Sequence, residues 1–144
     1  MGTVAPGLLV VTNGRLAGEL ETAARRIVGD VAALASISLD WDDDVVDARR
    51  RIEEGIERVA VEGRVLILTD MFGGTPSNVA LSLLEPGKID IVTGVNLPML
   101  IKFANLHAVD GFDETVRRIA QQGRDAIQVA SEVLEKRDGP ERAK

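Results

Sequence analysis

A carboxylate and two adjacent glycines follow an apolar run in the segment TDMFGGTPSN, at residues 69–78. The glycines permit a tight turn that presents backbone N–H groups, and the start of the helix expected next would favour an anion. Thr75 or Ser77 is expected to cap that helix, and Asp70 could orient a neighbouring histidine or a polar ligand group. The segment predicts an anion-binding turn or, equally, an ordinary strand-to-helix turn in which Asp70 bonds local backbone.

Thr12, Asn13 and Gly14 form a second polar turn, directly after the apolar run LLVV. Asn13 stands where a side chain could meet a ligand, but a carboxamide neither titrates near neutral pH nor acts as a nucleophile. Trp41 follows another apolar run. It is expected either to line the edge of a cleft or to pack against the core.

Several familiar catalytic arrangements are excluded by residue type. The turn at 69–78 lacks the lysine of a Walker A loop and the spacing of a G-x-S-x-G serine elbow. The chain has no cysteine, which rules out a disulfide, a thiolate nucleophile and a cysteine metal site. Its only histidine, His107, is expected to be a surface residue near a helix end. A helix cap and a solvated face explain the acidic run at 42–44 better than a cation site does, so we expect no metal ion. We expect no cofactor either.

Short apolar runs alternate with stretches of helical periodicity along the chain. Continuous apolar runs are typical of strands buried on both faces, and strand–helix alternation predicts βαβ units. We therefore expect an α/β fold: a doubly wound, mainly parallel sheet of about four strands with helices on both faces and the ligand site beyond the carboxyl ends of the strands. The expected strands span 7–12, 31–39, 65–70 and 89–94, and the expected helices span 15–29, 43–60, 76–84 and 96–106, with a last helix from near Asp113.

The 144 residues are expected to form one domain, with a core over about residues 7–135 and a polar, frayed tail at 136–144. The stretch GRDAIQVAS at 123–131 is ambiguous, because Ile127 and Val129 alternate as in a strand while the flanks look helical. The net charge of −6 disfavours nucleic acid and is compatible with a basic protein partner. The lack of cysteine, of a membrane-length apolar run and of a signal-peptide pattern indicates a cytoplasmic protein without membrane insertion.

Three blocks of the sequence, GLLVVTNG, LILTDMFGGTPSN and VTGVNLPML, together resemble the EIIA domain of the mannose-type bacterial sugar phosphotransferase system (PTS). They occur in the family's order, and the resemblance covers about residues 7 to 135. It implies a homodimer in which a C-terminal strand packs on the partner's sheet, which would make 123–131 an exchanged antiparallel strand. It also implies a carrier that takes a phosphoryl group from the histidine phosphocarrier protein HPr and passes it to EIIB, which phosphorylates incoming sugar.

In the family that the chain resembles, a histidine after the first strand accepts the phosphoryl group and an aspartate after the third strand orients it. Asp70 matches the orienting carboxylate, and Asn13 stands at the acceptor position. The resemblance places the phosphate pocket at Thr12, Gly14, Phe72, Gly73, Gly74, Thr75 and Ser77.

The amide nitrogen of Asn13 is delocalised into its carbonyl and cannot carry phosphate as an imidazole can. Its amide is expected to donate to Asp70 in place of an imidazole N–H. The sequence favours a phosphotransfer-incompetent EIIA homologue that acts by binding or regulation, with HPr, EIIB or a regulatory protein as partner. The alternatives are a working phosphocarrier, with its acceptor changed by engineering or replaced by another residue, and a different small-anion role. Whether the chain is an enzyme stays open.

Overall fold

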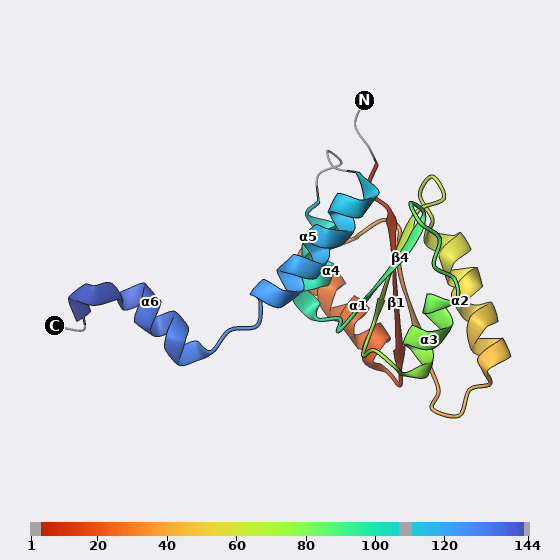
Figure 1. Cartoon of the computed structure of the whole chain (residues 1–144), viewed down its shortest axis with the longest axis horizontal. Coiled ribbons are helices and arrows are strands. Elements are labelled where there is room, and N and C mark those ends of the chain that lie inside the picture. The colour runs from red at the N-terminus through yellow and green to blue at the C-terminus, as the bar shows by residue number, and fades with distance from the viewer. Residues whose placement is uncertain (1–3, 107–110, 143–144) are drawn as a thin grey trace.

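The computed structural model describes residues 4–106 and 111–142. Within these ranges the chain forms four strands and six helices, which alternate as far as the fourth helix (Figure 1). The elements are β1 (Gly7–Asn13), α1 (Leu16–Val28), β2 (Leu34–Leu39), α2 (Val45–Val59), β3 (Val65–Thr69), α3 (Thr75–Leu81), β4 (Ile89–Thr93), α4 (Leu97–Ala104), α5 (Phe112–Asp125) and α6 (Ala130–Arg142).

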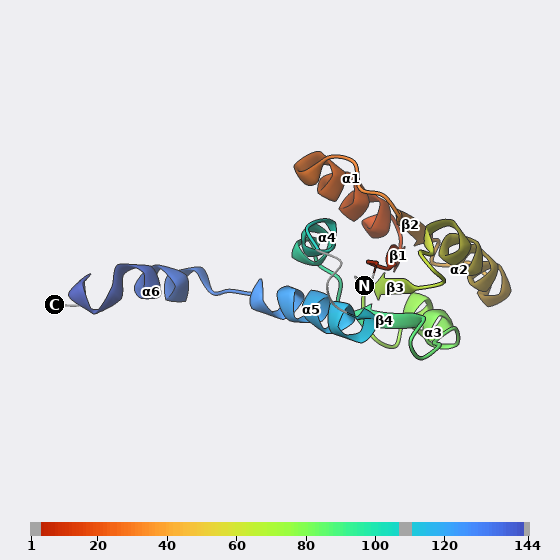
Figure 2. The same ribbon diagram turned by 90° about the horizontal axis from the view of Figure 1, so that it is seen from above.

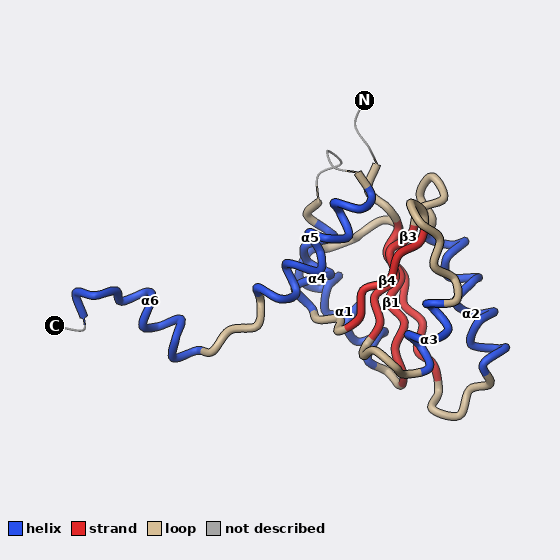
Figure 3. Tube along the Cα trace, in the orientation of Figure 1, coloured by secondary structure: helices blue, strands red, loops and turns tan. Residues whose placement is uncertain are grey.

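The four strands form one parallel sheet in the order β2-β1-β3-β4. Helices α1, α4 and α5 pack on one face, and α2 and α3 pack on the other, so the sheet lies between two helical layers (Figure 2, Figure 3). The connection from β1 uses one face and the connections from β2 and β3 use the opposite face, so the chain changes face between the neighbouring strands β1 and β3. The predicted doubly wound parallel sheet is confirmed.

Alternate side chains of the central strands enter the two layers of the core. Leu8 and Val10 of β1 pack with α1 and α4, whereas Leu9 and Val11 pack with α2. All four side chains are fully buried, which explains why this strand reads as a continuous apolar run. The edge strand β4 differs, since all five of its residues are only partly buried. The expected burial on both faces therefore holds in the centre of the sheet and fails at β4.

The helices begin and end within a few residues of their expected limits. Asp44 caps α2, because its carboxylate accepts the backbone N–H of Val46 at 3.4 Å, as the acidic opening predicted. Asn96 caps α4 by accepting the N–H of Met99 at 3.2 Å. The pattern of the sequence indicated a helix there without indicating its cap.

The C-terminal segment departs most from expectation. Residues 126–129, all of which the structure describes, lie in no strand, and α6 extends away from the sheet (Figure 1, Figure 2). The expected frayed tail is wrong for residues 136–142, which lie in α6 and include strong helix formers such as glutamate, lysine and arginine. The single chain does not form an exchanged strand from Ile127 and Val129, which are 80% and 57% exposed, and that strand stays a prediction about a dimer.

Candidate functional site

The turn that follows β1 is held by backbone and hydroxyl bonds. Gly14 has φ +63°, a left-handed conformation that costs a residue with a Cβ roughly 1–2 kcal/mol, and its N–H donates to the carbonyl oxygen of Leu39 at 2.8 Å. The buried hydroxyl of Thr12 accepts the N–H of Ala17 at 2.7 Å and ties the start of α1 to the end of β1. These contacts place Asn13, the last residue of β1, at the carboxyl edge of the sheet and partly buried.

Asp70 joins the ends of β3 and β1. One of its carboxylate oxygens accepts the backbone N–H of Asn13 at 3.1 Å, and the other accepts the N–H of Met71 at 2.9 Å. Because β1 and β3 are neighbours in the sheet, the residue after β3 reaches the last residue of β1. The structure thus combines the two interpretations of this carboxylate: Asp70 bonds local backbone and also contacts the candidate acceptor position.

The side chain of Asn13 takes no part in this contact. Its backbone N–H donates to Asp70, while its carboxamide has no hydrogen-bond partner among the described residues. The expected hydrogen bond from the Asn13 amide to Asp70 is therefore absent, and the backbone N–H of Asn13 donates to the carboxylate instead. The carboxamide is left to bond solvent or a ligand at this edge of the sheet.

The glycine turn after β3 is braced from inside α3. Gly73 adopts φ +93°, and its N–H donates at 2.9 Å to the hydroxyl of Ser77, which in turn donates to the carbonyl oxygen of Gly74 at 3.1 Å. The amide of Asn78 adds a bond to the carbonyl oxygen of Gly73 at 3.2 Å. Gly74 is the N-cap residue, and no side chain caps the helix. The expected capping role of Thr75 or Ser77 is therefore wrong, because Thr75 begins the helix and Ser77 folds back on the turn.

Some backbone N–H groups at the start of α3 remain without an acceptor among the described residues. The N–H of Gly73 is taken by Ser77, but those of Gly74 and Thr75 donate to no acceptor within the part of the chain that the structure describes. Free N–H groups at the start of a helix favour an anion. The structure shows the internal bonds of an ordinary strand-to-helix turn, and anion binding by the remaining donors stays a prediction.

The turn after β4 connects to the same edge of the sheet. The N–H of Gly94 donates to the carbonyl oxygen of Asp70 at 3.1 Å, and that of Val95 donates to the carbonyl oxygen of Thr69 at 3.0 Å. Thr69 is fully buried, and within the described ranges its hydroxyl has no hydrogen-bond partner, a state that costs free energy. Nothing in the sequence singles out this hydroxyl, because packing alone decides which polar atom is left unpaired.

Large apolar side chains flank the site on two sides. Trp41, after β2, is 79% exposed, while Met71 and Phe72, after β3, are 64% and 69% exposed. Because β1 lies between β2 and β3, Asn13 lies between these two loops. A Cβ on Gly14 would stand 3.8 Å from the indole nitrogen of Trp41. Trp41 therefore lines the edge of the site and does not pack in the core, which decides between the two expectations for it.

The acidic run after Trp41 serves structure. Asp43 accepts the N–H of Asp40 at 2.7 Å and pairs with Arg51 at 3.2 Å, while Asp44 caps α2. Within residues 4–106 and 111–142, no cluster of three or more histidine, cysteine, aspartate or glutamate residues could hold a metal ion. The remaining sequence candidate, His107, lies outside the described residues.

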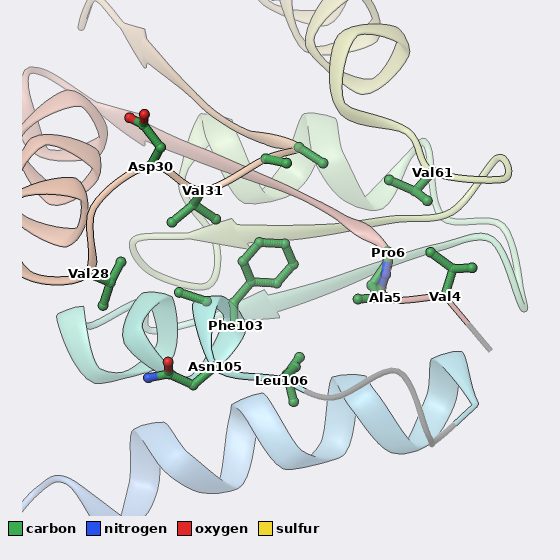
Figure 4. Close-up of a pocket in the computed structure, with 13 residues that line it drawn as sticks. Val4, Ala5, Pro6, Val28, Asp30, Val31, Val61, Phe103, Asn105 and Leu106 are labelled. Atoms are coloured by element: carbon green, nitrogen blue, oxygen red, sulfur yellow. The ribbon is translucent and has the colours of Figure 1, made fainter. Parts of the chain in front are cut away.

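A cavity of about 380 Å³ lies at the opposite, amino edge of the sheet (Figure 4). Apolar side chains such as Val31, Phe103 and Leu106 form most of its lining, and Asp30 and Asn105 are its polar side chains. None of the residues expected to do chemistry lines this cavity. The polar turns gather at the carboxyl edge instead, as parallel sheets of this kind predict.

Comparison with known proteins identifies the family. The family model EIIA-man, described as the PTS system fructose IIA component, matches residues 7–120. The chain belongs to the mannose-type EIIA family. This EIIA chain is 28% identical over 118 residues to the fructose-specific EIIA component of Bacillus subtilis (strain 168), with 81% of each protein covered. It is 30% identical over 98 residues to the sorbose-specific EIIA component of Lacticaseibacillus casei, with 67% of this chain and 70% of that protein covered.

Solved EIIA structures share the fold of this EIIA chain. The mannose/sorbose-specific IIA subunit from Enterococcus faecalis has a TM-score of 0.78 at 29% identity, with 88% of this chain and 95% of that chain covered. The IIA protein associated with the fucose utilization operon of Streptococcus pneumoniae has a TM-score of 0.79 at 25% identity, with 94% of this chain and 100% of that chain covered. The family predicted from three sequence blocks is confirmed, and so is its PTS role in sugar transport. In the described residues of this EIIA chain, no helix has the length and hydropathy to cross a membrane.

Proposed function

We propose that this EIIA protein keeps the fold and the docking surface of a PTS phosphoryl carrier but does not carry the phosphoryl group at Asn13. It acts in the cytoplasm, by binding or regulation, within the sugar-uptake system of its family. The observation that carries the proposal is the contact between Asn13 and Asp70 at adjacent strand ends. The resemblance places an acceptor histidine and its orienting carboxylate at these two positions.

The chemistry of the two side chains explains the proposed loss. An imidazole ring nitrogen has an available lone pair and accepts a phosphoryl group as a nucleophile. The amide nitrogen of Asn13 has its lone pair delocalised into the carbonyl, so it forms no such bond at neutral pH. The hydrogen bond from Asn13 to Asp70 comes from the backbone, so it does not depend on the side chain. The turn can therefore keep its shape while the nucleophile is missing.

The glycine turn supports a retained docking role. The free N–H groups of Gly74 and Thr75 can bind oxygens of a phosphoryl group carried by a docked partner. Thr12 and Gly14 hold the first turn, and Ser77 holds the second. The partners that the family implies are HPr-type and EIIB-type proteins. If the protein no longer accepts a phosphoryl group, its alternative partner is a regulatory protein.

Phosphorylation by the upstream PTS proteins tests the proposal. The protein is incubated with phosphoenolpyruvate, enzyme I and HPr, and its intact mass is measured. We expect no mass gain for the unsubstituted chain and a gain of one phosphoryl group for Asn13→His. Asn13→Gln keeps a carboxamide and is the matched control, which should stay unlabelled. Asn13→His with Asp70→Asn should label more slowly than Asn13→His alone, because the orienting carboxylate is lost.

Two outcomes would contradict the proposal in different ways. Stable phosphate on the unsubstituted chain would support the alternative, a working phosphocarrier that uses a residue other than Asn13. A folded Asn13→His protein that gains no phosphate would show that the pocket has changed beyond this one position. If Asn13 is an engineered residue, Asn13→His restores the natural carrier and labels fully.

We also propose that the protein is a homodimer. The outer edge of β4 pairs with no strand among the described residues, and such an edge favours pairing with another chain. Ile127 and Val129 alternate and are exposed, as the residues of an exchanged strand would be in a separated chain. Sedimentation equilibrium should give twice the monomer mass for the unsubstituted chain and the monomer mass for Ile127→Lys with Val129→Lys. Leu84→Lys, at another exposed apolar position, should leave the dimer intact.

A further inference from the structure

The loop after β2 holds the only tryptophan of the chain in solvent. Trp41 is 79% exposed, although an indole ring gains free energy whenever it is buried. Met71 and Phe72, on the other side of the site, are exposed as well. Exposed apolar side chains on two loops that flank one site are a feature of interaction surfaces.

The loop that carries Trp41 is held in one conformation. The carboxylate of Asp43 accepts the N–H of Asp40 at 2.7 Å, and the N–H of Asp43 donates to the carbonyl oxygen of Asp40 at 3.1 Å. Arg51 of α2 then donates to Asp43 at 3.2 Å and to the carbonyl oxygen of Ser38 at 3.1 Å. A side chain on a loop fixed in this way loses little conformational freedom when it binds a partner.

The strand order places this loop beside the Asn13–Asp70 contact. A Cβ on Gly14 would stand 3.8 Å from the indole nitrogen of Trp41, so the ring lies next to the turn that carries Asn13. The Met71-Phe72 loop follows β3, on the other side of β1. Asn13 therefore lies between the loop that carries Trp41 and the loop after β3.

The charges around Trp41 indicate the kind of partner. Asp40, Asp42 and Asp44 are exposed, and none of them forms an ion pair within the described ranges. Asp43 is the exception, since it pairs with Arg51. The ring is thus flanked by three exposed carboxylates that form no ion pair with the described residues, although Asp44 also caps α2. Such a cluster favours a partner whose contact surface carries lysine or arginine. The net charge of −6 also attracts a basic partner, at longer range.

We propose that Trp41 is the anchor that selects and holds the protein partner at this site. The partner is a protein with an apolar depression that receives the indole ring and a rim of basic side chains that faces Asp40, Asp42 and Asp44. The loop bonds of Asp43 and Arg51 position the ring before binding. This inference rests on the proposed function, because it takes the partner to be the carrier protein that docks over Asn13.

Calorimetric titration with purified HPr-type and EIIB-type proteins of the same PTS tests this role. We expect Trp41→Ala to weaken binding of the docking carrier by at least about tenfold, as loss of a central aromatic anchor does. Trp41→Phe keeps an aromatic ring, so its affinity for the carrier should fall by less than that of Trp41→Ala. Ile27→Ala removes an exposed apolar side chain at the opposite end of α1 and is the matched control, with binding unchanged. Far-UV circular dichroism checks that each variant is folded.

Two further measurements separate an anchor from a general effect. The emission of Trp41, the only tryptophan, should shift to shorter wavelength as a tryptophan-free carrier is added, because the ring enters an apolar depression. Arg51→Met leaves the ring in place but loosens its loop, so it should weaken binding by less than Trp41→Ala. Affinity for a basic partner should fall as the ionic strength rises from about 0.05 M to about 0.5 M, because salt screens the attraction. In the double variant Asp42→Asn with Asp44→Asn, this fall should be smaller.

The outcomes distinguish this inference from the proposed function. If a carrier binds the unsubstituted chain, but Trp41→Ala binds equally well and the emission does not move, the anchor role is overturned and the proposed function stands. If neither carrier binds the unsubstituted chain, the proposed docking function fails, and the anchor role fails with it.

Discussion

The two edges of the sheet show different kinds of surface. The amino edge has a cavity of about 380 Å³ with a mostly apolar lining (Figure 4). At the carboxyl edge, Asn13, Asp70 and the glycine turn meet between exposed apolar side chains. Parallel strands explain this difference, because each strand that leads into a helix at the carboxyl edge brings free N–H groups and a positive dipole end there. The direction of the strands therefore explains where the polar turns gather, and the position of the cavity does not.

Gly7→Ala, at the amino edge, is expected to have the largest effect on stability. A Cβ on Gly7 would lie 1.9 Å from the backbone oxygen of Val59, which cannot move aside as a side chain can. We expect the free energy of unfolding, measured by urea denaturation, to fall by about 3 kcal/mol or more. Gly18→Ala is the control, because its Cβ would meet nothing closer than 3.7 Å and alanine favours a helix. Similar losses for the two variants would contradict the close approach of Gly7 to the backbone of Val59.

Thr12→Val tests the link between the site and α1 and should have an intermediate effect. The substitution keeps the shape of the side chain but removes the hydroxyl oxygen that accepts the N–H of Ala17. We expect a loss of about 1–2 kcal/mol in the free energy of unfolding and faster hydrogen exchange at the Ala17 amide. Thr22→Val, at an exposed position on the same helix, should change neither quantity by much. Unchanged exchange at Ala17 would show that the hydroxyl does not hold the turn.

Gly14→Ala, at the carboxyl edge, should cost least. A Cβ on Gly14 has room, with the nearest atom at 3.8 Å, so only the left-handed backbone conformation is penalised. We expect a loss of about 1 kcal/mol by urea denaturation, and a smaller loss for Gly14→Asn, since asparagine tolerates this conformation. A loss as large as that of Gly7→Ala would contradict the difference in free space around Gly7 and Gly14.

The elements of the fold could be predicted from the sequence more fully than their contacts. Apolar runs and helical periodicity indicated the four strands and the first five helices, and the acidic opening of α2 indicated the cap at Asp44. The same reasoning was wrong for the cap of α3, because a hydroxyl near a helix start can face either the helix or the preceding turn. In Ser77 it faces the turn and bonds Gly73. The tail was misjudged because its polar residues are also good helix formers.

In the candidate site, too, the residues could be predicted from the sequence and their contacts could not. The residue types and the edge on which they lie followed from local pattern, because parallel strands bring their carboxyl ends together. The bond between Asp70 and the backbone of Asn13 did not, since it joins residues 57 positions apart and needs β1 and β3 to be neighbours. The exposure of Trp41 and the unpaired hydroxyl of Thr69 likewise depend on what packs beside them.

The sequence by itself determined the alternation of strands and helices and the family, because residue identity and short-range periodicity carry that information. The tertiary structure alone decided which strands are neighbours, which donor satisfies Asp70 and which large apolar side chains stay in solvent. These depend on contacts between distant parts of the chain, and no short-range pattern encodes such contacts.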